Sequence, residues 1–206
     1  GDRAVEWLQN RDSSQPFLLH VGFAGPHSPI EPFPTYMDLY RDAPETEPWG
    51  VVEYPERLPD GRRGYRAMIS QIDAHVGRIC DVLAERGELE NTIVVYTADH
   101  GDMLGEHGLW GKSQFYEGAA QIPMILVGSS GDDRVASGLV DDRLVGWQDV
   151  MPTLLDLAGI DVPETVEGRS MVGEKREFLY GEHGEEKRAN RMMHDGRHKL
   201  IYYPAG

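Results

Sequence analysis

The chain has 206 residues, a length within the usual range of one domain and sufficient to bury a hydrophobic core. Its 35 acidic against 20 basic residues give a net charge of −15, which argues against the phosphate backbone of nucleic acid as a partner. The single cysteine excludes an internal disulfide and a cysteine-rich zinc site. No apolar run approaches the roughly 18 residues that a membrane span needs, and residues 1–10 lack the order of a signal peptide. The composition indicates neither a cell compartment nor an oligomeric state.

The N-terminal part of the chain is predicted to form a short helix and then a strand. The apolar spacing of residues 4–10 is typical of a helix, and the apolar run of residues 17–23 is typical of a strand. His20 lies inside this strand and is interpreted as a core or sheet-face histidine.

The predicted strand ends at Gly25-Pro26-His27-Ser28-Pro29, where the two prolines are expected to hold the backbone extended around His27. A histidine fixed in this way can donate a hydrogen bond to an anion, although a structural role in a turn is the commoner one for a lone histidine. Residues 31–60 are rich in proline, glutamate and aromatic residues without a period, so we expect a surface connection with one helical turn in residues 35–40. This connection could form a wall of a substrate pocket.

Residues 64–87 give the clearest helical pattern, with apolar side chains at spacings of three and four and Gly87 as the stop. Cys80 falls on the apolar stripe of this helix. It is therefore interpreted as a small buried hydrophobic residue and not as a nucleophile.

The stretch that suggests chemistry follows the predicted buried strand of residues 92–96. Asp99 and His100 come directly after this strand, at the edge of an α/β sheet where ligands usually bind. A carboxylate beside a neutral imidazole can bind a divalent cation, and Lys112 further along the loop can hold an anionic group. The structural alternative is a turn capped by the aspartate and a solvated lysine.

The remainder of the chain predicts short elements. Residues 113–120 can start a helix, and the apolar residues within 121–128 predict a second buried strand. A helix is expected in residues 147–158, with Pro152 near its start and Gly159 at its end. Residues 176–180 predict a short strand, and residues 192–203 a hairpin with its turn at Asp195-Gly196.

Three stretches resemble the type I sulfatases of the alkaline phosphatase superfamily: TADHGDMLGEHGLWGKSQFYEGAAQIPMIL, FLLHVGFAGPHSPI and QDVMPTLLDLAGIDVPETVEGRSM. The resemblance implies an α/β fold, in which part of an alkaline-phosphatase-like mixed sheet is flanked by helices, with a small C-terminal antiparallel sheet. Residues 1–175 would be the C-terminal part of the catalytic domain, and residues 176–206 the start of the C-terminal subdomain.

The resemblance also implies a chemistry, in which a hydrated formylglycine attacks a sulfate ester with the help of a divalent metal, usually calcium. Asp99 and His100 match the second pair of metal ligands, and Lys112 matches the lysine that bridges nucleophile and sulfate. His27 matches the histidine that contacts sulfate and can protonate the leaving oxygen. His100 departs from the commoner asparagine, and a nitrogen ligand makes manganese, iron or zinc easier to accommodate.

Two elements of the sulfatase pattern do not occur in this sequence. These are the nucleophile motif, Cys or Ser followed by x-Pro-x-Arg, and the first metal-binding Asp-Asp pair. We expect both in a part of the protein that precedes Gly1. The chain by itself is therefore expected to be inactive and to bind metal weakly.

Two other functions remain compatible with the sequence. One is a phosphonate monoester or phosphodiester hydrolase of the same superfamily, and the other is a non-catalytic module that binds sulfated glycans. For the sulfatase, the expected partner is a sulfated small molecule or glycan. Residues that could line its pocket, or equally be exposed loop residues, are Glu106, His107, Trp110, Glu182, His183, Arg188 and Arg191.

Overall fold

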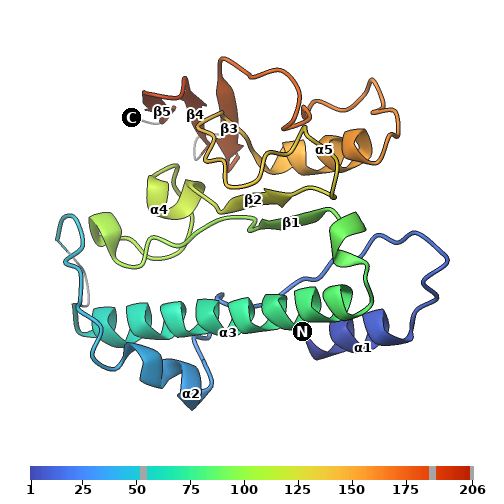
Figure 1. The fold of residues 1–206 in the computed structure, drawn as a ribbon. Coiled ribbons are helices and arrows are strands. Elements are labelled where there is room, and N and C mark those ends of the chain that lie inside the picture. The colour runs from blue at the N-terminus through green and yellow to red at the C-terminus, as the bar shows by residue number, and fades with distance from the viewer. Residues whose placement is uncertain (52–54, 186–188, 205–206) are drawn as a thin grey trace. The chain divides into compact units, whose positions relative to one another are not determined.

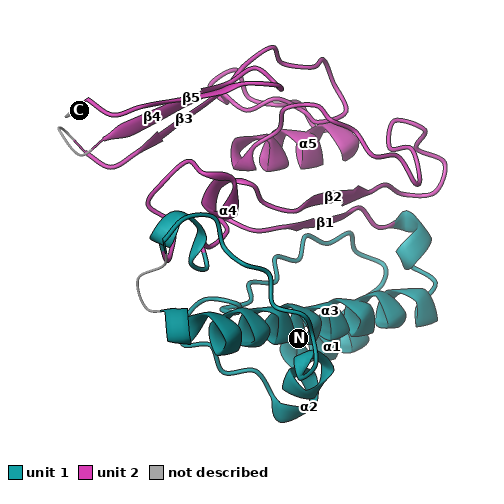
Figure 2. Ribbon diagram, turned by 90° about the vertical axis from the view of Figure 1, so that its left-hand side faces the viewer, with its two compact units in different colours: residues 1–91, 104–109 teal, residues 92–103, 110–206 magenta. Residues whose placement is uncertain are grey.

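The structure, a computed structural model, describes residues 1–51, 55–185 and 189–204 (Figure 1). The chain forms two compact units, each described by itself (Figure 2). Unit 1 comprises Gly1–Asn91 and Leu104–Leu109, and unit 2 comprises Thr92–Met103 and Trp110–Gly206. The predicted subdomain boundary at residue 175 stays a prediction.

Unit 1 is helical in the described residues. Helices α1 and α2 both pack against the long helix α3 (Figure 1). The helical turn expected in residues 35–40 is present as α2 and the 3-10 helix that follows it. The elements are α1 (Asp2–Asn10), α2 (Pro34–Met37), α3 (Leu58–Glu85) and the 3-10 helices Asp38–Tyr40, Pro55–Arg57, Leu89–Asn91 and Glu106–Gly108.

Helix α3 begins at Leu58, earlier than the predicted start at residue 64. Pro59 is tolerated in the first turn because the amide hydrogen that it lacks would have no partner there, and Asp60 interacts favourably with the positive end of the helix dipole. Cys80 is half-buried on α3, and burial raises the pKa of its thiol, which disfavours the reactive thiolate. No helix in the described ranges is both long and apolar enough to span a membrane.

Residues 17–23 form no strand in the structure, contrary to the prediction. The physical reason is that no other strand pairs with them in the part of the chain that the structure describes. Phe17 and Leu19 pack against the core formed by Leu8, Val82 and Leu83, whereas Leu18 is 83% exposed. His20 is on the exposed side of this alternation, so it is not a core residue.

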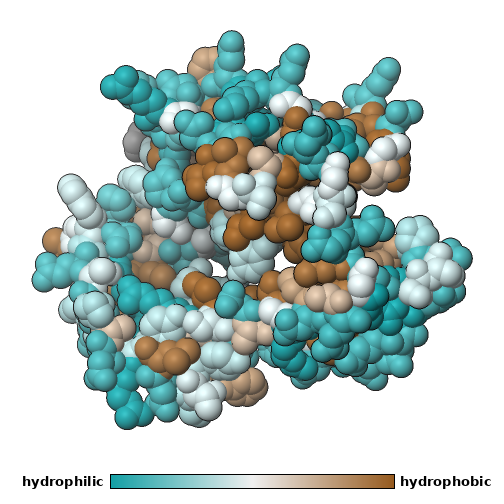
Figure 3. All heavy atoms as spheres, viewed as in Figure 1, coloured by the Kyte–Doolittle hydropathy of each residue, from teal (hydrophilic) through white to brown (hydrophobic). Residues whose placement is uncertain are grey.

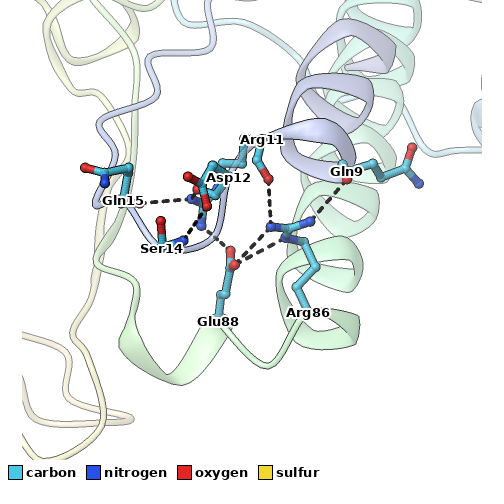
Figure 4. Close-up of polar contacts among 7 residues, drawn as sticks. All are labelled: Gln9, Arg11, Asp12, Ser14, Gln15, Arg86 and Glu88. Carbon is cyan, nitrogen blue, oxygen red and sulfur yellow. Dashed lines mark hydrogen bonds and ion pairs between the residues drawn. The ribbon is translucent and has the colours of Figure 1, made fainter.

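An ion-pair cluster links the end of α1 to the end of α3 (Figure 4). Glu88 pairs with both Arg11 and Arg86. Arg86 also donates from Nη1 to the carbonyl oxygen of Gln9 (3.1 Å) and from Nη2 to that of Arg11 (3.3 Å). The two arginines hold the pKa of Glu88 below its ordinary value, chiefly through the hydrogen bond from Arg86.

Unit 2 contains two antiparallel sheets and short helices. The first sheet pairs β1 with β2, with Val94 opposite Val127 and Thr97 opposite Met124. The second sheet has the order β3-β4-β5. The elements are β1 (Val94–Thr97), α4 (Glu117–Ala120), β2 (Met124–Val127), the 3-10 helix Trp147–Asp149, α5 (Val150–Leu157), β3 (Leu179–His183), β4 (Asn190–His194) and β5 (Lys199–Tyr202).

The strands β1 and β2 are not the buried strands that their composition predicted. All four residues of β1 are half-buried, and Ile125 and Val127 of β2 are about half exposed. Figure 3 shows hydrophobic side chains gathered on the surface around β2. The burial prediction failed because alternate side chains of a strand point to opposite faces, and in β2 only those of Met124 and Leu126 are half-buried, whereas Ile125 and Val127 stay exposed.

The predicted C-terminal hairpin is confirmed. β4 and β5 are joined by a turn at Asp195-Gly196, and Gly196 adopts a φ of +90° that a glycine accommodates without strain. The Asp195 carboxylate accepts hydrogen bonds from the backbone N–H groups of Arg197 (2.8 Å) and His198 (2.5 Å). The preceding strand begins at Leu179, later than the predicted start at residue 176.

A buried aspartate organises the segment around α5. Asp149 is 1% exposed and accepts hydrogen bonds from the backbone N–H groups of Gly146 and Arg169, both at 2.8 Å, while it pairs with Arg176. This carboxylate therefore joins the start of α5 to two segments that follow it. The predicted helix with Pro152 near its start is confirmed, as the 3-10 helix continued by α5.

Candidate active site

The residues that follow β1 form the candidate site. The strand ends at Thr97, and Asp99 and His100 stand two and three residues beyond it. Asp99 Oδ1 accepts a hydrogen bond from the His100 backbone N–H (3.0 Å), and Asp99 Oδ2 lies 3.3 Å from His100 Nε2. The side chain of Asp99 is exposed and that of His100 is partly buried. The two predicted metal ligands are thus adjacent in space, with one oxygen and one nitrogen facing each other.

The His100 ring is fixed by a second contact. Its Nδ1 atom lies 2.7 Å from the carbonyl oxygen of Gly101. Because a carbonyl oxygen can only accept, Nδ1 carries the hydrogen, and Nε2 of the neutral ring has a free lone pair. This lone pair and the carboxylate of Asp99 both require a positive partner, so the donor set fits a divalent cation.

The backbone beside His100 is held by α4. The Gly101 N–H donates to the carbonyl oxygen of Ala119 (2.8 Å). A Cβ atom on residue 101 would lie 2.2 Å from the carbonyl oxygen of Gly118, so only glycine permits this close approach. The carbonyl that orients the His100 ring therefore belongs to a rigidly placed residue.

The backbone just before Lys112 is hydrogen-bonded to the residues that follow His100. Gly111 donates from its backbone N–H to Asp102 Oδ1 (3.1 Å), and the Met103 N–H donates to the Gly111 carbonyl oxygen (2.8 Å). The Lys112 side chain is exposed, and among the described residues no ion pair or hydrogen bond occupies its ammonium group. Unit 2 thus holds the backbone of Lys112 next to that of Asp102, while the ammonium group stays accessible.

His27 lies in unit 1, in a turn and not in the extended segment that was predicted. The reason is local: the His27 N–H donates to the carbonyl oxygen of Ala24 (3.1 Å), which closes a turn over residues 24–27. The ring is exposed, and Nδ1 donates to the Ser28 carbonyl oxygen at 2.6 Å. Nε2 is thereby the ring nitrogen that remains for another partner. The meeting of His27 with Asp99, His100 and Lys112 stays a prediction.

The other predicted pocket residues fall into different surroundings. Glu106 and His107 belong to unit 1, where Glu106 pairs with Arg62 at 2.8 Å. Glu182 and Arg191 form an exposed ion pair across β3 and β4 at 2.9 Å, and His183 is exposed at the end of β3. Arg188 lies outside the described residues.

Trp110 has a different environment from the other pocket candidates. Its indole Nε1 atom is buried and has no acceptor in the described part of the chain. A buried donor without a partner is costly, so this N–H is available to an acceptor that the structure does not contain.

Two residues with a positioning role were missed by the sequence reasoning. Asp102 holds the base of the Lys112 loop, and Arg62, which is 5% exposed, holds the loop Leu104–Leu109. Asp102 stands in the DHGD motif and could have been found as a carboxylate that caps a turn. Arg62 gave no signal, because the predicted helix began beyond it.

The described residues contain no group of three or more His, Cys, Asp or Glu side chains arranged to hold a metal ion. Asp99 and His100 are a pair only. A small pocket in unit 2 is lined by Arg143, Asp149, Arg169 and Arg176, and it includes none of the four predicted site residues. Asp149 pairs there with Arg176, and Asp141 pairs with Arg143, so charges in this pocket are largely compensated.

The chain belongs to the sulfatase family, whose sequence profile matches residues 1–160. The matched range includes the strand end with Asp99 and His100 and the loop with Lys112. It confirms the family resemblance drawn from the three sequence stretches.

Individual relatives agree with this assignment. An arylsulfatase of Clostridium perfringens is 32% identical over 98% of this chain and 48% of its own length. A choline-sulfatase of Rhizobium meliloti is 35% identical over 74% of this chain and 33% of its own length. The chain thus spans about half the length, or less, of these curated relatives.

A solved structure supports the fold. The phosphonate monoester hydrolase of Agrobacterium radiobacter superposes with a TM-score of 0.84 over 97% of this chain and 50% of that chain, at 22% identity. The predicted fold class, a partial alkaline-phosphatase-like α/β fold with a small C-terminal antiparallel sheet, is confirmed.

Proposed function

We propose that the full-length protein hydrolyses a sulfate ester and that this chain supplies half of its metal site together with the groups that hold the sulfate. The observation that carries the proposal is the 3.3 Å approach of Asp99 Oδ2 to His100 Nε2, on a ring whose Nδ1 is committed to Gly101. Family membership supports the reaction class. The substrate would be a sulfated small molecule or glycan.

Asp99 and His100 would hold a divalent cation, which when bound polarises the sulfate group and lowers the energy of charge that develops on its oxygens. The mixed oxygen and nitrogen donors accept calcium, and they also suit manganese or zinc. The Gly101 carbonyl oxygen orients the His100 ring. Its hydrogen bond from Nδ1 keeps the Nε2 lone pair turned toward Asp99.

Lys112 would bind the sulfate as a compact positive charge. Its exposed ammonium group is free to reach an anion, and the hydrogen bond from Gly111 to Asp102 fixes the backbone from which it extends. In a chain with a net charge of −15, such a local cation is needed to attract an anionic ester.

His27 would protonate the leaving oxygen. With Nδ1 donating to the Ser28 carbonyl oxygen, only Nε2 can face a substrate. Nε2 can donate a proton only from the imidazolium form, so His27 would have to be protonated before the ester bond breaks and neutral afterwards.

The nucleophile is expected in the part of the full-length protein that this chain lacks, as a formylglycine. We therefore propose that the isolated chain neither turns over sulfate esters nor binds metal tightly, since a pair of ligands leaves most of a coordination shell to water.

The test compares the rates at which the full-length protein hydrolyses 4-nitrophenyl sulfate and the matched 4-nitrophenyl phenylphosphonate, both measured by the release of 4-nitrophenol. A sulfatase hydrolyses the sulfate faster, whereas faster hydrolysis of the phosphonate would replace the proposal by a phosphonate monoester hydrolase. Hydrolysis of neither ester, by protein that carries its metal and its formylglycine, would favour the non-catalytic glycan-binding module.

A further inference from the structure

We propose that Asn190 is a positioning residue that fixes the loop carrying Lys112. Asn190 is the first residue of β4, in the C-terminal sheet. Its side-chain Nδ2 donates to the carbonyl oxygen of Ser113, the residue that follows Lys112, at 3.3 Å. All three residues belong to unit 2 (Figure 2). This role rests on the function proposed above, in which Lys112 binds the sulfate.

The side chain of Asn190 is costly where it stands. Asn190 is 4% exposed, and because a carbonyl oxygen can only accept, the NH2 group of its amide faces Ser113. The other polar atom, Oδ1, is buried and has no hydrogen-bond partner among the described residues. A buried acceptor without a partner lowers stability, and asparagine is also disfavoured in strands. A contribution to the fold alone does not explain an asparagine at this position, whereas a specific donor to the Ser113 carbonyl oxygen does.

The backbone is held on both sides of Lys112. Before it, the Gly111 N–H donates to Asp102 Oδ1 at 3.1 Å. After it, the Ser113 carbonyl oxygen accepts from Asn190. The lysine side chain between these two contacts is exposed. Each neighbour of Lys112 is therefore tied by a side chain to a different segment of unit 2.

The C-terminal sheet also contacts the residues that lead from this loop to α4. Lys199, the first residue of β5, donates from Nζ to the carbonyl oxygen of Phe115 (3.2 Å) and pairs with Glu117 at the start of α4. Tyr203, just after β5, donates from its hydroxyl group to Gln114 Oε1 (2.8 Å). The whole segment is thus bound to the sheet, so a change in β4 can reach the loop directly.

This arrangement matters for a lysine because its side chain is long and flexible. The ammonium group of an exposed lysine is placed only as well as the backbone that carries it. A displacement of about 1 Å in a group that stabilises the transition state can lower the rate about 10²-fold. By holding the Ser113 carbonyl oxygen, Asn190 would restrict the backbone at Lys112 and act on turnover without touching the substrate.

The test is a double-mutant cycle in the full-length protein, with 4-nitrophenyl sulfate as the substrate. Asn190→Leu removes the donor, and water can replace it at Ser113, which is exposed, so the fold should stay intact. We expect this substitution to lower kcat/KM roughly 10-fold in wild type and to leave kcat/KM of Lys112→Ala nearly unchanged, because its effect passes through the lysine. Asn190→Ala, which adds no atoms to the site, repeats the cycle if leucine does not fit.

Amide hydrogen exchange tests the contact without any turnover. Mass spectrometry of a peptide that covers residues 112–116 reports how often this loop opens in the full-length protein. We expect faster exchange of this peptide in Asn190→Leu and unchanged exchange of β1. The matched control is Met192→Leu, a volume-conserving change on the same buried face of β4, which should alter neither exchange nor kcat/KM.

The outcomes separate the positioning role from the proposed function. If wild-type protein hydrolyses sulfate esters but Asn190→Leu changes neither loop exchange nor kcat/KM, the positioning role is wrong and the sulfatase stands. Equal losses of kcat/KM in wild type and in Lys112→Ala would also overturn the role, since Asn190 would then support the fold alone. If loop exchange rises in a protein that hydrolyses no sulfate ester, Asn190 holds the loop and the sulfatase is wrong.

Discussion

The carboxylate oxygen Oδ2 of Asp99 lies 3.3 Å from Nε2 of His100, and the opposite nitrogen of that ring donates to the Gly101 carbonyl oxygen. When the imidazole is neutral, the Asp99 carboxylate oxygen and His100 Nε2 are both hydrogen-bond acceptors, and they face each other. Such a contact is unfavourable until a proton or a metal ion lies between them. The local geometry thus gives the pair a reason to bind a cation that does not depend on family membership.

Replacement of the nitrogen donor should change the preferred metal. In the full-length protein, His100→Asn should keep calcium-supported hydrolysis of an aryl sulfate, because an amide oxygen suits a hard cation. The same variant should lose activity with manganese or zinc relative to wild type, since it lacks the imidazole. Activity of metal-stripped protein restored with each metal in turn measures this. An unchanged ratio of the manganese- and calcium-supported rates would show that His100 is not a ligand.

Loss of the loop lysine should reduce turnover without destabilising the fold. Lys112→Ala in the full-length protein is expected to lower kcat/KM for a sulfate ester by roughly 10²-fold, as removal of one group that stabilises developing charge does. The free energy of unfolding should be unchanged, because the side chain is exposed. Lys175→Ala, which removes another exposed lysine, is the matched control and should leave kcat/KM unaltered. Equal effects of the two substitutions would remove Lys112 from the site.

The ion-pair cluster of Figure 4 should make the stability of the protein depend on pH. Arg86 and Arg11 lower the pKa of Glu88 below 4.5, its ordinary value. A carboxyl group with a lowered folded-state pKa contributes stability above its unfolded pKa, and this contribution is lost as the pH falls below about 4.5 toward the folded value. Wild type should therefore lose more stability between pH 7 and pH 3.5 than Glu88→Gln, which binds no proton. Urea unfolding at both pH values measures the difference, and parallel losses in the two proteins would contradict it.

Removal of the buried carboxylate beside α5 should be strongly destabilising. Asp149→Ala leaves Arg176 and two backbone N–H groups without their acceptor, and breaking a buried pair in this way typically costs about 3–5 kcal/mol. Glu182→Ala, which breaks the exposed pair with Arg191, is the control and should cost much less. Urea unfolding compares the two. A similar small cost for both would show that the Asp149 cluster does not hold this part of unit 2.

Local sequence signals predicted the elements whose causes are local. The turn at Asp195-Gly196 was found because a glycine with positive φ and an aspartate that caps its own turn are visible in the sequence. The early start of α3 was missed because Pro59 and Gly61 resemble a break, although both are tolerated in a first turn. The positions of Asp99 and His100 were predicted from the strand end that precedes them.

What the sequence could not predict depends on partners far along the chain. Residues 17–23 have the alternation of a strand, but a strand requires hydrogen-bonding neighbours, which the described residues do not provide. The burial of β2 was overestimated for the same kind of reason, because apolar composition reports what a strand can bury and not what covers it. Arg62 joins Thr46, Leu104 and Glu106 across gaps of 16 to 44 residues, which no local pattern reveals.

The central claim is that Asp99 and His100 share one divalent cation, and the ligation of His100 can be observed directly. The full-length protein, labelled with ¹⁵N-histidine and loaded with manganese(II), is measured by pulsed electron paramagnetic resonance, which detects a nitrogen bound to the metal. We expect a histidine nitrogen coupling in wild type and in His107→Ala, and none in His100→Ala. A coupling that persists in His100→Ala, or that is absent from manganese-loaded wild type, would contradict the account.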